Sequence, residues 1–321
     1  MKATEEIFRK LEQSLAEHES EIKTDEDYEK FIADFAREYN QSLDLPNLKD
    51  RPLDAYDYID MAETASTERE AVSYLKKALK LDPNNLDALA MMAGYTAKTV
   101  EDNIEALEEI LKIGEKKLRS EGFFDDCMGE FWLAFETRPY MRTRYEYMEL
   151  LKKSGKIQLA IRECERMIEL CDSDNLGVRY TLMTLYAWTN DYKSARKLHG
   201  EFSVDRSASF ELPFAVVAYS ANDYKAAEKS LRVALDQNKD IAKFINYIVS
   251  NKQGKIEDIY RKSMLDFGIR IGSIEEPVNW YMQNLQLMSA FFMFFLWAKR
   301  TIGPVKTTTS SKGKKNKTTK K

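Results

Sequence analysis

The sequence contains few residues that break helices or bind metal ions. Only 12 of its 321 residues are glycine and 7 are proline, about half of average usage. A β-sandwich or β-barrel needs many more turns, so an all-β fold is excluded. Three cysteines and two histidines are too few for a disulfide framework or a Cys/His zinc site. We therefore expect neither a metal nor another cofactor.

The remaining composition is that of a folded protein with unevenly distributed charge. Apolar residues make up 44% of the chain and charged residues 32%, which excludes a mostly disordered chain. The N-terminus is charged and has no apolar signal-peptide core, so we expect a cytoplasmic protein. From Lys299 to Lys321 there are nine basic residues and no acidic one, and the preceding 298 residues carry a net charge of −13. An acidic body therefore precedes a basic tail.

Small and aliphatic residues recur in the sequence at a nearly constant interval. Ala71, Leu75, Ala78 and Pro83 have the spacing of the second helix of a tetratricopeptide (TPR) unit and the proline that ends it. Small residues at these positions let a neighbouring helix approach closely. The pattern recurs at Ala106, Ile110 and Ile113; at Ala160, Cys164 and Met167; at Ala195; and at Ala227, Leu231 and Ala234.

The intervals between these alanines are 35, 54, 35 and 32 residues, and all but the second are close to the 34-residue TPR period. The long interval indicates one inserted helix, which we place at 123–136. The sequence predicts the following helices, and no strands: 2–21, 26–42, 54–65, 67–81, 85–98, 101–119, 123–136, 139–153, 156–171, 174–188, 191–202, 208–220, 223–236, 240–250, 254–267 and 275–299.

These elements predict an all-α, TPR-like solenoid of antiparallel helix hairpins with a C-terminal capping helix and a disordered lysine-rich tail. We divide it into an N-terminal helical hairpin at 1–45, a TPR-like repeat domain with its closing helix at 53–299, and the disordered basic tail at 300–321. The joint between the first two segments is LDLPNLKDRP, residues 43–52.

Two stretches of sequence carry a more specific resemblance. EFWLAFETRPYMR at 130–142 and SDNLGVRYTLM at 173–183 resemble a family of mostly bacterial TPR-like proteins without an assigned biochemical activity. The similarity spans roughly 55–290. Some members end in a Cys-rich zinc-binding tail, whereas this chain ends in lysines, so no metal carries over. The resemblance implies an interaction protein rather than an enzyme.

The stretch ETRPYMR is the strongest candidate for a partner-binding surface. Thr137 would cap the following helix, Pro139 would lie in its first turn, and the arginines would face a carboxylate or phosphate. First helices line the concave face of a TPR solenoid, so Arg179, which opens a later first helix, would converge on the same face. The candidate residues are Arg138, Tyr140, Arg142, Tyr145 and Arg179. The alternative is structural: Tyr140 packs inside the hairpin and Glu136 pairs locally with an arginine.

An aromatic stripe lies on the predicted inserted helix. It consists of Phe124, Met128, Phe131, Trp132 and Phe135. Such a stripe would form either a peptide-docking groove or the core of that helix, and the core is the more frequent role.

The basic tail has two interpretations. Its lysines, Lys312, Lys314, Lys315, Lys317, Lys320 and Lys321, would dock on RNA, the ribosome or an anionic lipid surface through weak, nonspecific attraction. The alternative is a tail that only increases solubility.

The segment 277–298 is uncharged and ends in a cluster of aromatic residues. Its first half is rich in Asn and Gln, so a helix that closes the last repeat is favoured over a membrane span. Attachment to a membrane surface through 287–298 and binding of a partner helix remain as alternatives.

The sequence has no motif of an enzyme active site. Phosphate-binding glycine loops, metalloprotease motifs and nucleophile elbows are absent, and His18 and His199 have no evident nucleophile to activate. We therefore predict a non-enzymatic scaffold that binds a protein or peptide partner on its concave surface. The alternatives are an RNA- or ribosome-associated factor that docks through the tail, and a peripheral membrane adaptor that uses 287–298.

Overall fold

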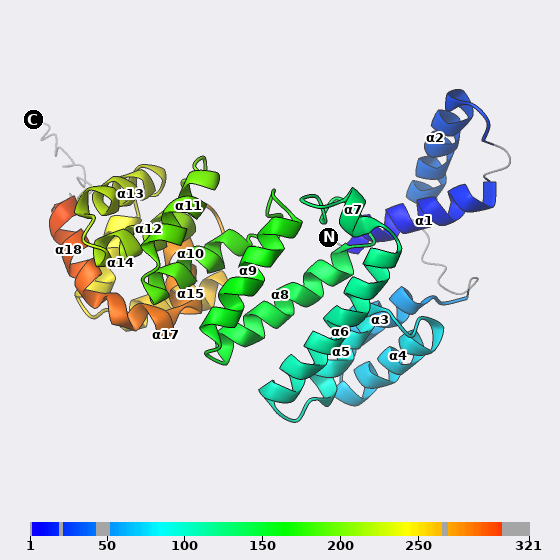
Figure 1. Cartoon of the computed structure of the whole chain (residues 1–321), viewed down its shortest axis with the longest axis horizontal. Coiled ribbons are helices and arrows are strands. Elements are labelled where there is room, and N and C mark those ends of the chain that lie inside the picture. Colours follow the sequence, from blue (N-terminus) through cyan, green and yellow to red (C-terminus); the bar gives the residue numbers. More distant parts are fainter. Residues whose placement is uncertain (1, 19–21, 43–51, 265–268, 304–321) are drawn as a thin grey trace, which may run out of the picture. The chain divides into compact units, whose positions relative to one another are not determined.

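A computed structural model describes residues 2–18, 22–42, 52–264 and 269–303 (Figure 1). Within these ranges all regular structure is helical, and the one β-type pairing is an isolated bridge between Glu130 and Cys171. The predicted fold class, an all-α TPR-like arrangement of antiparallel helix hairpins, is confirmed. The tail residues 304–321, most of the joint at 43–52 and the end of the predicted helix 254–267 lie outside the described residues.

The chain forms two compact units that interleave in the sequence. The N-terminal unit comprises Met1–Gly155 and Glu169–Ser173, and the C-terminal unit comprises Lys156–Ile168 and Asp174–Lys321. This division falls inside the repeats and does not follow our predicted segments, which stay a prediction. A single helix, α9 (Ile157–Leu170), contributes residues to both units.

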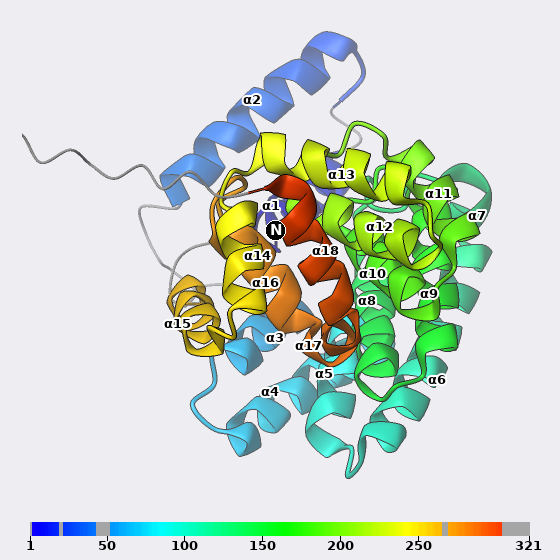
Figure 2. The same ribbon diagram turned by 90° about the vertical axis from the view of Figure 1, so that its left-hand side faces the viewer.

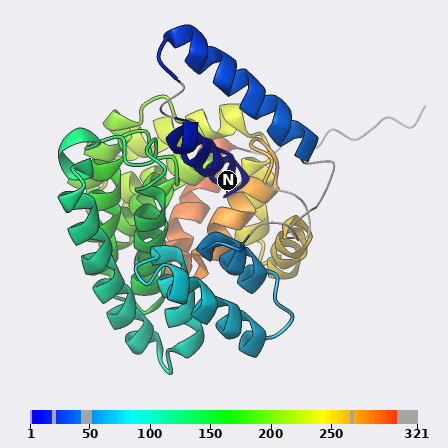
Figure 3. The same ribbon diagram turned by 90° about the vertical axis from the view of Figure 1, so that its right-hand side faces the viewer.

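The N-terminal unit contains a helix pair followed by two repeat hairpins. Figure 3 shows these helices. In α1 and α2, His18 contacts Phe31 and the Lys10 ammonium lies over the Tyr39 ring, which is an antiparallel arrangement. The hairpins α3–α4 and α5–α6 pack side by side, and α8 packs on α5 and α6. The elements are α1 (Lys2–His18), α2 (Asp25–Ser42), α3 (Ala55–Glu63), α4 (Glu68–Leu81), α5 (Leu86–Thr96), α6 (Val100–Ser120), α7 (Phe123–Asp126) and α8 (Arg138–Lys153).

The C-terminal unit is built around α12, which is buried along nearly its whole length. Helix α12 contacts α10, α11, α13, α16 and α18, and α18 also lies against α14 (Figure 2). The elements after α9 are α10 (Val178–Thr189), α11 (Tyr192–Glu201), α12 (Ala208–Ser220), α13 (Tyr224–Gln237), α14 (Ile241–Val249), α15 (Gln253–Ser263), α16 (Glu275–Gln283), α17 (Leu285–Met288), the short 3-10 helix η1 (Ser289–Phe291) and α18 (Phe292–Ile302).

Short polar side chains start most of the repeat helices. Each accepts a hydrogen bond from a backbone N–H of the first turn, which contributes about 1 kcal/mol per helix. The capping residues are Thr67 for α4, Asn85 for α5, Thr99 for α6, Asp191 for α11 and Asp223 for α13. Residues with positive φ angles, Gly155 and Asn190, follow the ends of α8 and α10 and begin the hairpin turns.

Six of the seven alanines of the repeat pattern lie in the core, as the TPR spacing predicts. Their exposed fraction is at most 1%. These residues are Ala71, Ala78, Ala160, Ala195, Ala227 and Ala234. The prediction is wrong in α6 at Ala106, which is only half-buried, and at Ile113, which is 39% exposed. The residues that follow them, Leu107 and Gly114, are buried instead. The pattern in α6 is therefore shifted by one residue relative to the other repeats.

Gly114 permits the close approach of α6 to its neighbours. A Cβ atom at this position would lie 2.7 Å from Leu86 Cδ1 and 2.9 Å from Tyr140 Cδ2. We expect Gly114→Ala to lower the free energy of unfolding by about 1–2 kcal/mol, because the clash outweighs the better helix propensity of alanine. Gly94 in α5 has open space around it, so Gly94→Ala should raise the same quantity by about 0.5–1 kcal/mol. Urea denaturation would measure both changes, and equal stabilisation would contradict the tight contact.

The predicted helix 123–136 is wrong beyond its first turn. Helix α7 ends at Asp126, and Gly129 has φ +87°. The following residues form turns, and Phe131 donates its backbone N–H to Leu170 O at 3.0 Å. Phe124, Phe131 and Trp132 are nonetheless buried, whereas Met128 is 44% exposed. These aromatic side chains therefore belong mainly to the core, but not as a helical stripe.

The predicted closing helix 275–299 is also wrong as a single element. Helix α16 ends at Gln283, and the Asn284 side chain donates to Trp280 O at 2.8 Å, after which α17 and η1 turn the chain into α18. In α18, Phe295 is buried and packs edge-on against Phe244 of α14. Phe292 and Met293 of the same helix are 44% and 63% exposed. In the described part of the chain, no helix combines the length and apolar character that crossing a bilayer requires.

Candidate functional site

The loop before α8 positions the first arginine of the ETRPYMR stretch. The Thr137 hydroxyl donates to Phe131 O and to Ala134 O, so it holds the loop closed. Thr137 precedes α8 but makes no side-chain capping bond there, which corrects its predicted role. Pro139 lies in the first turn, as predicted, where a missing N–H costs no hydrogen bond. Arg138 and Arg142 are then one turn apart on α8.

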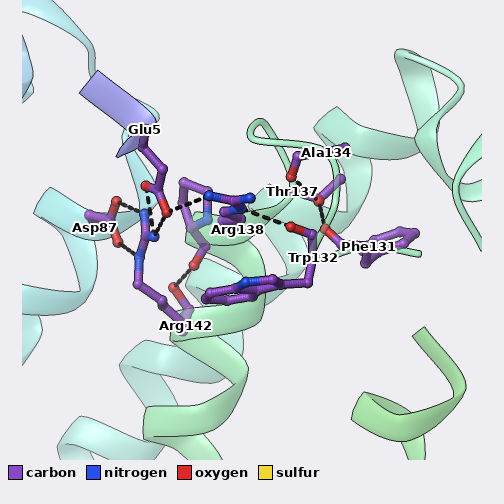
Figure 4. Close-up of polar contacts among 10 residues, drawn as sticks. Glu5, Asp87, Phe131, Trp132, Ala134, Thr137, Arg138 and Arg142 are labelled. Atoms are coloured by element: carbon purple, nitrogen blue, oxygen red, sulfur yellow. Dashed lines mark hydrogen bonds and ion pairs between the residues drawn. The ribbon is translucent and has the colours of Figure 1, made fainter. Parts of the chain in front are cut away.

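Arg142 joins two carboxylates that come from distant parts of the sequence (Figure 4). Its Nε and Nη2 atoms donate to the two oxygens of Asp87 on α5, at 2.9 and 2.7 Å. Its Nη1 atom donates to both oxygens of Glu5 on α1, at 2.8 and 2.9 Å. Every nitrogen of this guanidinium is engaged, and the fork-shaped geometry is the strong form of such contacts.

Arg138 contributes a second guanidinium to the same carboxylate. Its Nε atom donates to Trp132 O at 2.8 Å, and its Nη1 atom lies 3.5 Å from Glu5 Oε1. The guanidinium also lies over the Phe135 ring at 4.1 Å from the centroid, which favours a fixed orientation. Loop and helix together therefore aim both arginines at Glu5.

Burial strengthens this network of charges. The exposed fractions of the side chains are 21% for Arg142, 13% for Arg138 and Glu5, and 10% for Asp87. Burial alone would lower the pKa of Arg142, but the hydrogen bonds and charges of Asp87 and Glu5 raise that pKa above its ordinary value. Burial also raises the pKa of Glu146, and the charge of Asp87 adds to this effect. Arg142 therefore stays protonated. The carboxylates of Glu5 and Asp87 balance the guanidiniums of Arg138 and Arg142.

An aromatic contact accompanies the ionic one. The ring of Phe8 on α1 stacks on Phe135, with the centroids 4.5 Å apart. Phe8 follows Glu5 by three residues, so both side chains leave the same face of α1. Phe135 thus lies between Phe8 and the guanidinium of Arg138.

The two tyrosine candidates lie further along α8. Tyr140 is fully buried, accepts a hydrogen bond from Arg144 Nη2 at 2.6 Å and donates to Glu115 Oε2 at 3.3 Å. Any effect of Tyr140 on a partner would therefore act through the packing of α6 against α8. Tyr145 is half-buried.

Arg179 belongs to the C-terminal unit and binds carboxylates of that unit. It donates to Asp205 Oδ2 at 2.8 Å and to Asp174 Oδ2 at 2.9 Å. Asp174 also accepts the N–H groups of Val178 and Arg179 at the start of α10. Burial raises the pKa of Asp174, whereas hydrogen bonds from Ser207 and Arg179 outweigh burial and lower that of Asp205. The convergence of Arg179 with Arg138 and Arg142 stays a prediction.

Sequence reasoning missed the two carboxylates of the site. Glu5 lies in a segment that we treated as a separate hairpin, and no pattern links it to α8. Asp87 did carry a signal, because it is a single acidic residue in the apolar run LDALAMM and such a residue needs a partner when buried. Within the described ranges no group of His, Cys, Asp and Glu side chains has the arrangement of a metal site.

Comparison with known proteins identifies a curated relative and several similar solved structures. The chain matches no protein-family model. It is 31% identical over 122 residues to coatomer subunit epsilon of Caenorhabditis elegans, and this match covers 37% of the chain and 42% of that protein. Less than half of the relative is therefore represented.

Two of these solved structures are similar to the chain at low identity. MamA has 18% identity and a TM-score of 0.40 over 59% of this chain and 94% of its own. YrrB, described as a TPR protein with an unusual peptide-binding site, has 17% identity and a TM-score of 0.38 over 57% of this chain and 86% of its own. By its own helix hairpins and their buried small residues, the chain is a TPR-like repeat protein.

Proposed function

We propose that this chain is a non-enzymatic, cytoplasmic adaptor that binds a protein or peptide partner on the concave face of its repeats. Arg138 and Arg142 receive an acidic side chain of the partner. The supporting observation is that both guanidiniums bind the carboxylate of Glu5, which belongs to a helix outside the repeat hairpins. Arg142 lies on α8 and its ligand Asp87 on α5, and both are first helices of their hairpins.

The geometry supports recognition of a carboxylate rather than catalysis. Every nitrogen of the Arg142 guanidinium donates to Asp87 or Glu5, and the Arg138 guanidinium is held in place by the Trp132 carbonyl and the Phe135 ring. Such groups bind and orient an anion but do not transfer protons, because arginine stays charged. The curated relative is by name a subunit of an assembly, which supports a protein partner over a small substrate.

Capture of the partner by immobilised full-length chain tests this proposal. Partners would be identified by mass spectrometry and purified for binding measurements. The variant R138Q/R142Q/D87N removes the guanidiniums without leaving the buried Asp87 unpaired. We expect it to lower the partner's affinity at least tenfold, which corresponds to about 1.4 kcal/mol.

Two controls make this result specific. Lys112→Gln removes an exposed positive charge of α6 that lies outside the site, and it should leave affinity unchanged. A chain that ends at Gly303 should also bind normally. Unchanged affinity of the triple variant would contradict the proposal. Loss of binding in the shortened chain alone would favour the tail-mediated alternative, docking on RNA, the ribosome or a membrane.

A further inference from the structure

The ion pair between α1 and the two arginines has the form of a bound ligand. Glu5 reaches the site from a helix whose other pairing is with α2, through His18–Phe31 and Lys10–Tyr39. Phe8, its second anchor, stacks on Phe135 yet keeps 40% of its surface exposed. A structural core residue of this type is buried much further, as Phe131 shows with 0% exposure. The attachment of α1 to the site therefore consists of a specific ion pair and an aromatic contact that stays partly open to solvent.

The charges around the site indicate what would replace α1. With Glu5 withdrawn, Arg138 and Arg142 would face only the carboxylate of Asp87, which leaves one uncompensated positive charge in a largely buried place. Such a charge is costly without a counter-ion. The body of the protein is otherwise strongly acidic, so this position would stand out as an attractive site for an anion.

We infer that α1 is an internal ligand of the Arg138/Arg142 site and that the partner carries a helix of the same chemistry. This helix presents a glutamate to the two guanidiniums and an aromatic ring, three residues later, to Phe135. The partner's helix and α1 compete for one surface, so binding requires α1 to leave. The inference rests on the proposed function and specifies its partner as an acidic amphipathic helix.

The competition has a predictable size. A tethered ligand acts at an effective concentration in the millimolar range, so even a weak internal contact keeps the site mostly occupied. A partner's apparent dissociation constant is then raised by the inverse of the fraction of molecules with an open site. Weakening the internal ligand should therefore increase the affinity of an external one, whereas a purely structural role of α1 would decrease it or leave it unchanged.

A labelled peptide of residues 2–18 is the probe for this competition. Fluorescence anisotropy would measure its binding to the full-length chain and to the E5Q/F8A variant. Both substitutions lie on α1, outside the repeat hairpins, so we expect the repeat fold to stay intact. We expect the variant to bind the peptide at least tenfold more tightly than the unaltered chain. Glu17→Gln, on the exposed side of α1, serves as the matched control and should bind like the unaltered chain.

Three further measurements define the outcome. A peptide that carries both substitutions should not bind, and Arg138→Gln in the E5Q/F8A chain should lower its affinity for the normal peptide at least tenfold. Hydrogen exchange should show faster exchange of the α1 amides when the normal peptide is added in excess to the unaltered chain.

Equal peptide affinity of the E5Q/F8A and unaltered chains would overturn the inference. So would a concentration-dependent dimer that the two substitutions dissolve, because α1 would then occupy the site of a second copy. Neither result depends on the captured partner, and partner binding that ignores the arginines would instead contradict the proposed function.

Discussion

Replacing Arg142 with alanine should lower the free energy of unfolding by about 3 kcal/mol. The substitution leaves the carboxylate of Asp87 buried without its two hydrogen bonds and releases Glu5 of α1. The three side chains are 10–21% exposed. The expected loss of stability therefore lies at the lower end of the range for buried ion pairs. Urea denaturation followed by circular dichroism would measure it.

A rescue variant separates the ion pair from other effects of the truncation. Asp87→Asn in the R142A background removes the unpaired charge and should recover about 1 kcal/mol or more. Lys112→Ala is the matched control, because its pair with Glu109 is 60% and 71% exposed, and such surface pairs contribute less than about 0.5 kcal/mol. If Arg142→Ala cost no more than Lys112→Ala, the network would have no structural weight.

Glu276→Ala should destabilise the C-terminal unit by about 4 kcal/mol. This carboxylate is 4% exposed and accepts the N–H of Ala208 at 2.7 Å, where α12 begins. Its other oxygen accepts the side-chain amide of Asn238 and the N–H of Gly272, both at 2.9 Å. Since Ser207 offers no side-chain cap to α12, Glu276 replaces a local cap with one from α16. Its removal takes an acceptor from the buried N–H of Ala208, from the buried side-chain amide of Asn238 and from the N–H of Gly272 in the exposed turn before α16. Differential scanning calorimetry would record a lower Tm.

Two substitutions bracket this prediction. Glu276→Gln keeps one acceptor oxygen and should lose about half of the effect. Glu257→Ala removes the same chemical group from the exposed face of α15. Its free energy of unfolding should stay within about 0.5 kcal/mol of that of the unaltered chain. A Tm of Glu276→Ala equal to that of Glu257→Ala would show that α12 needs no external cap.

The repeat architecture was predictable because it depends on local patterns. Ala71, Leu75 and Ala78 occupy one helical face, and capping residues such as Thr67 mark where the helix starts. Such signals lie within a few residues of one another. The error at Ile113 arose because α6 extends over 21 residues, and in a helix of this length a shift by one residue still satisfies most of the pattern.

The irregular segments were not predictable, because tertiary contacts decide them. FFDDCMGEFWLAFE has the composition of a helix, yet its backbone pairs with Leu170 and Asp172, some forty residues away. In the same way, the break at Asn284 lets Phe295 reach Phe244, which no local propensity encodes. Here two backbone hydrogen bonds to a distant segment and the burial of Phe131 and Trp132 accompany the loss of helix.

The candidate site was half predictable. The dense cluster of arginines and aromatics in the ETRPYMR stretch is visible in the amino-acid sequence and singles out Arg138 and Arg142. Their ligands are separated from them by 55 to 137 residues, so only the folded chain brings them together. The sequence thus indicated which groups would bind an anion, but not that the chain supplies one itself.

The pairing of Gly129 and Phe131 with residues 170–172 determines where the chain can be divided into fragments. Those residues belong to the N-terminal unit although they follow a stretch that belongs to the other one. A cut at Gly155 would remove the backbone partners of the loop at 127–133. It would also separate α9 from the N-terminal unit, to which the last residues of this helix belong. We therefore expect neither fragment produced by a cut at Gly155 to keep its complete set of backbone contacts.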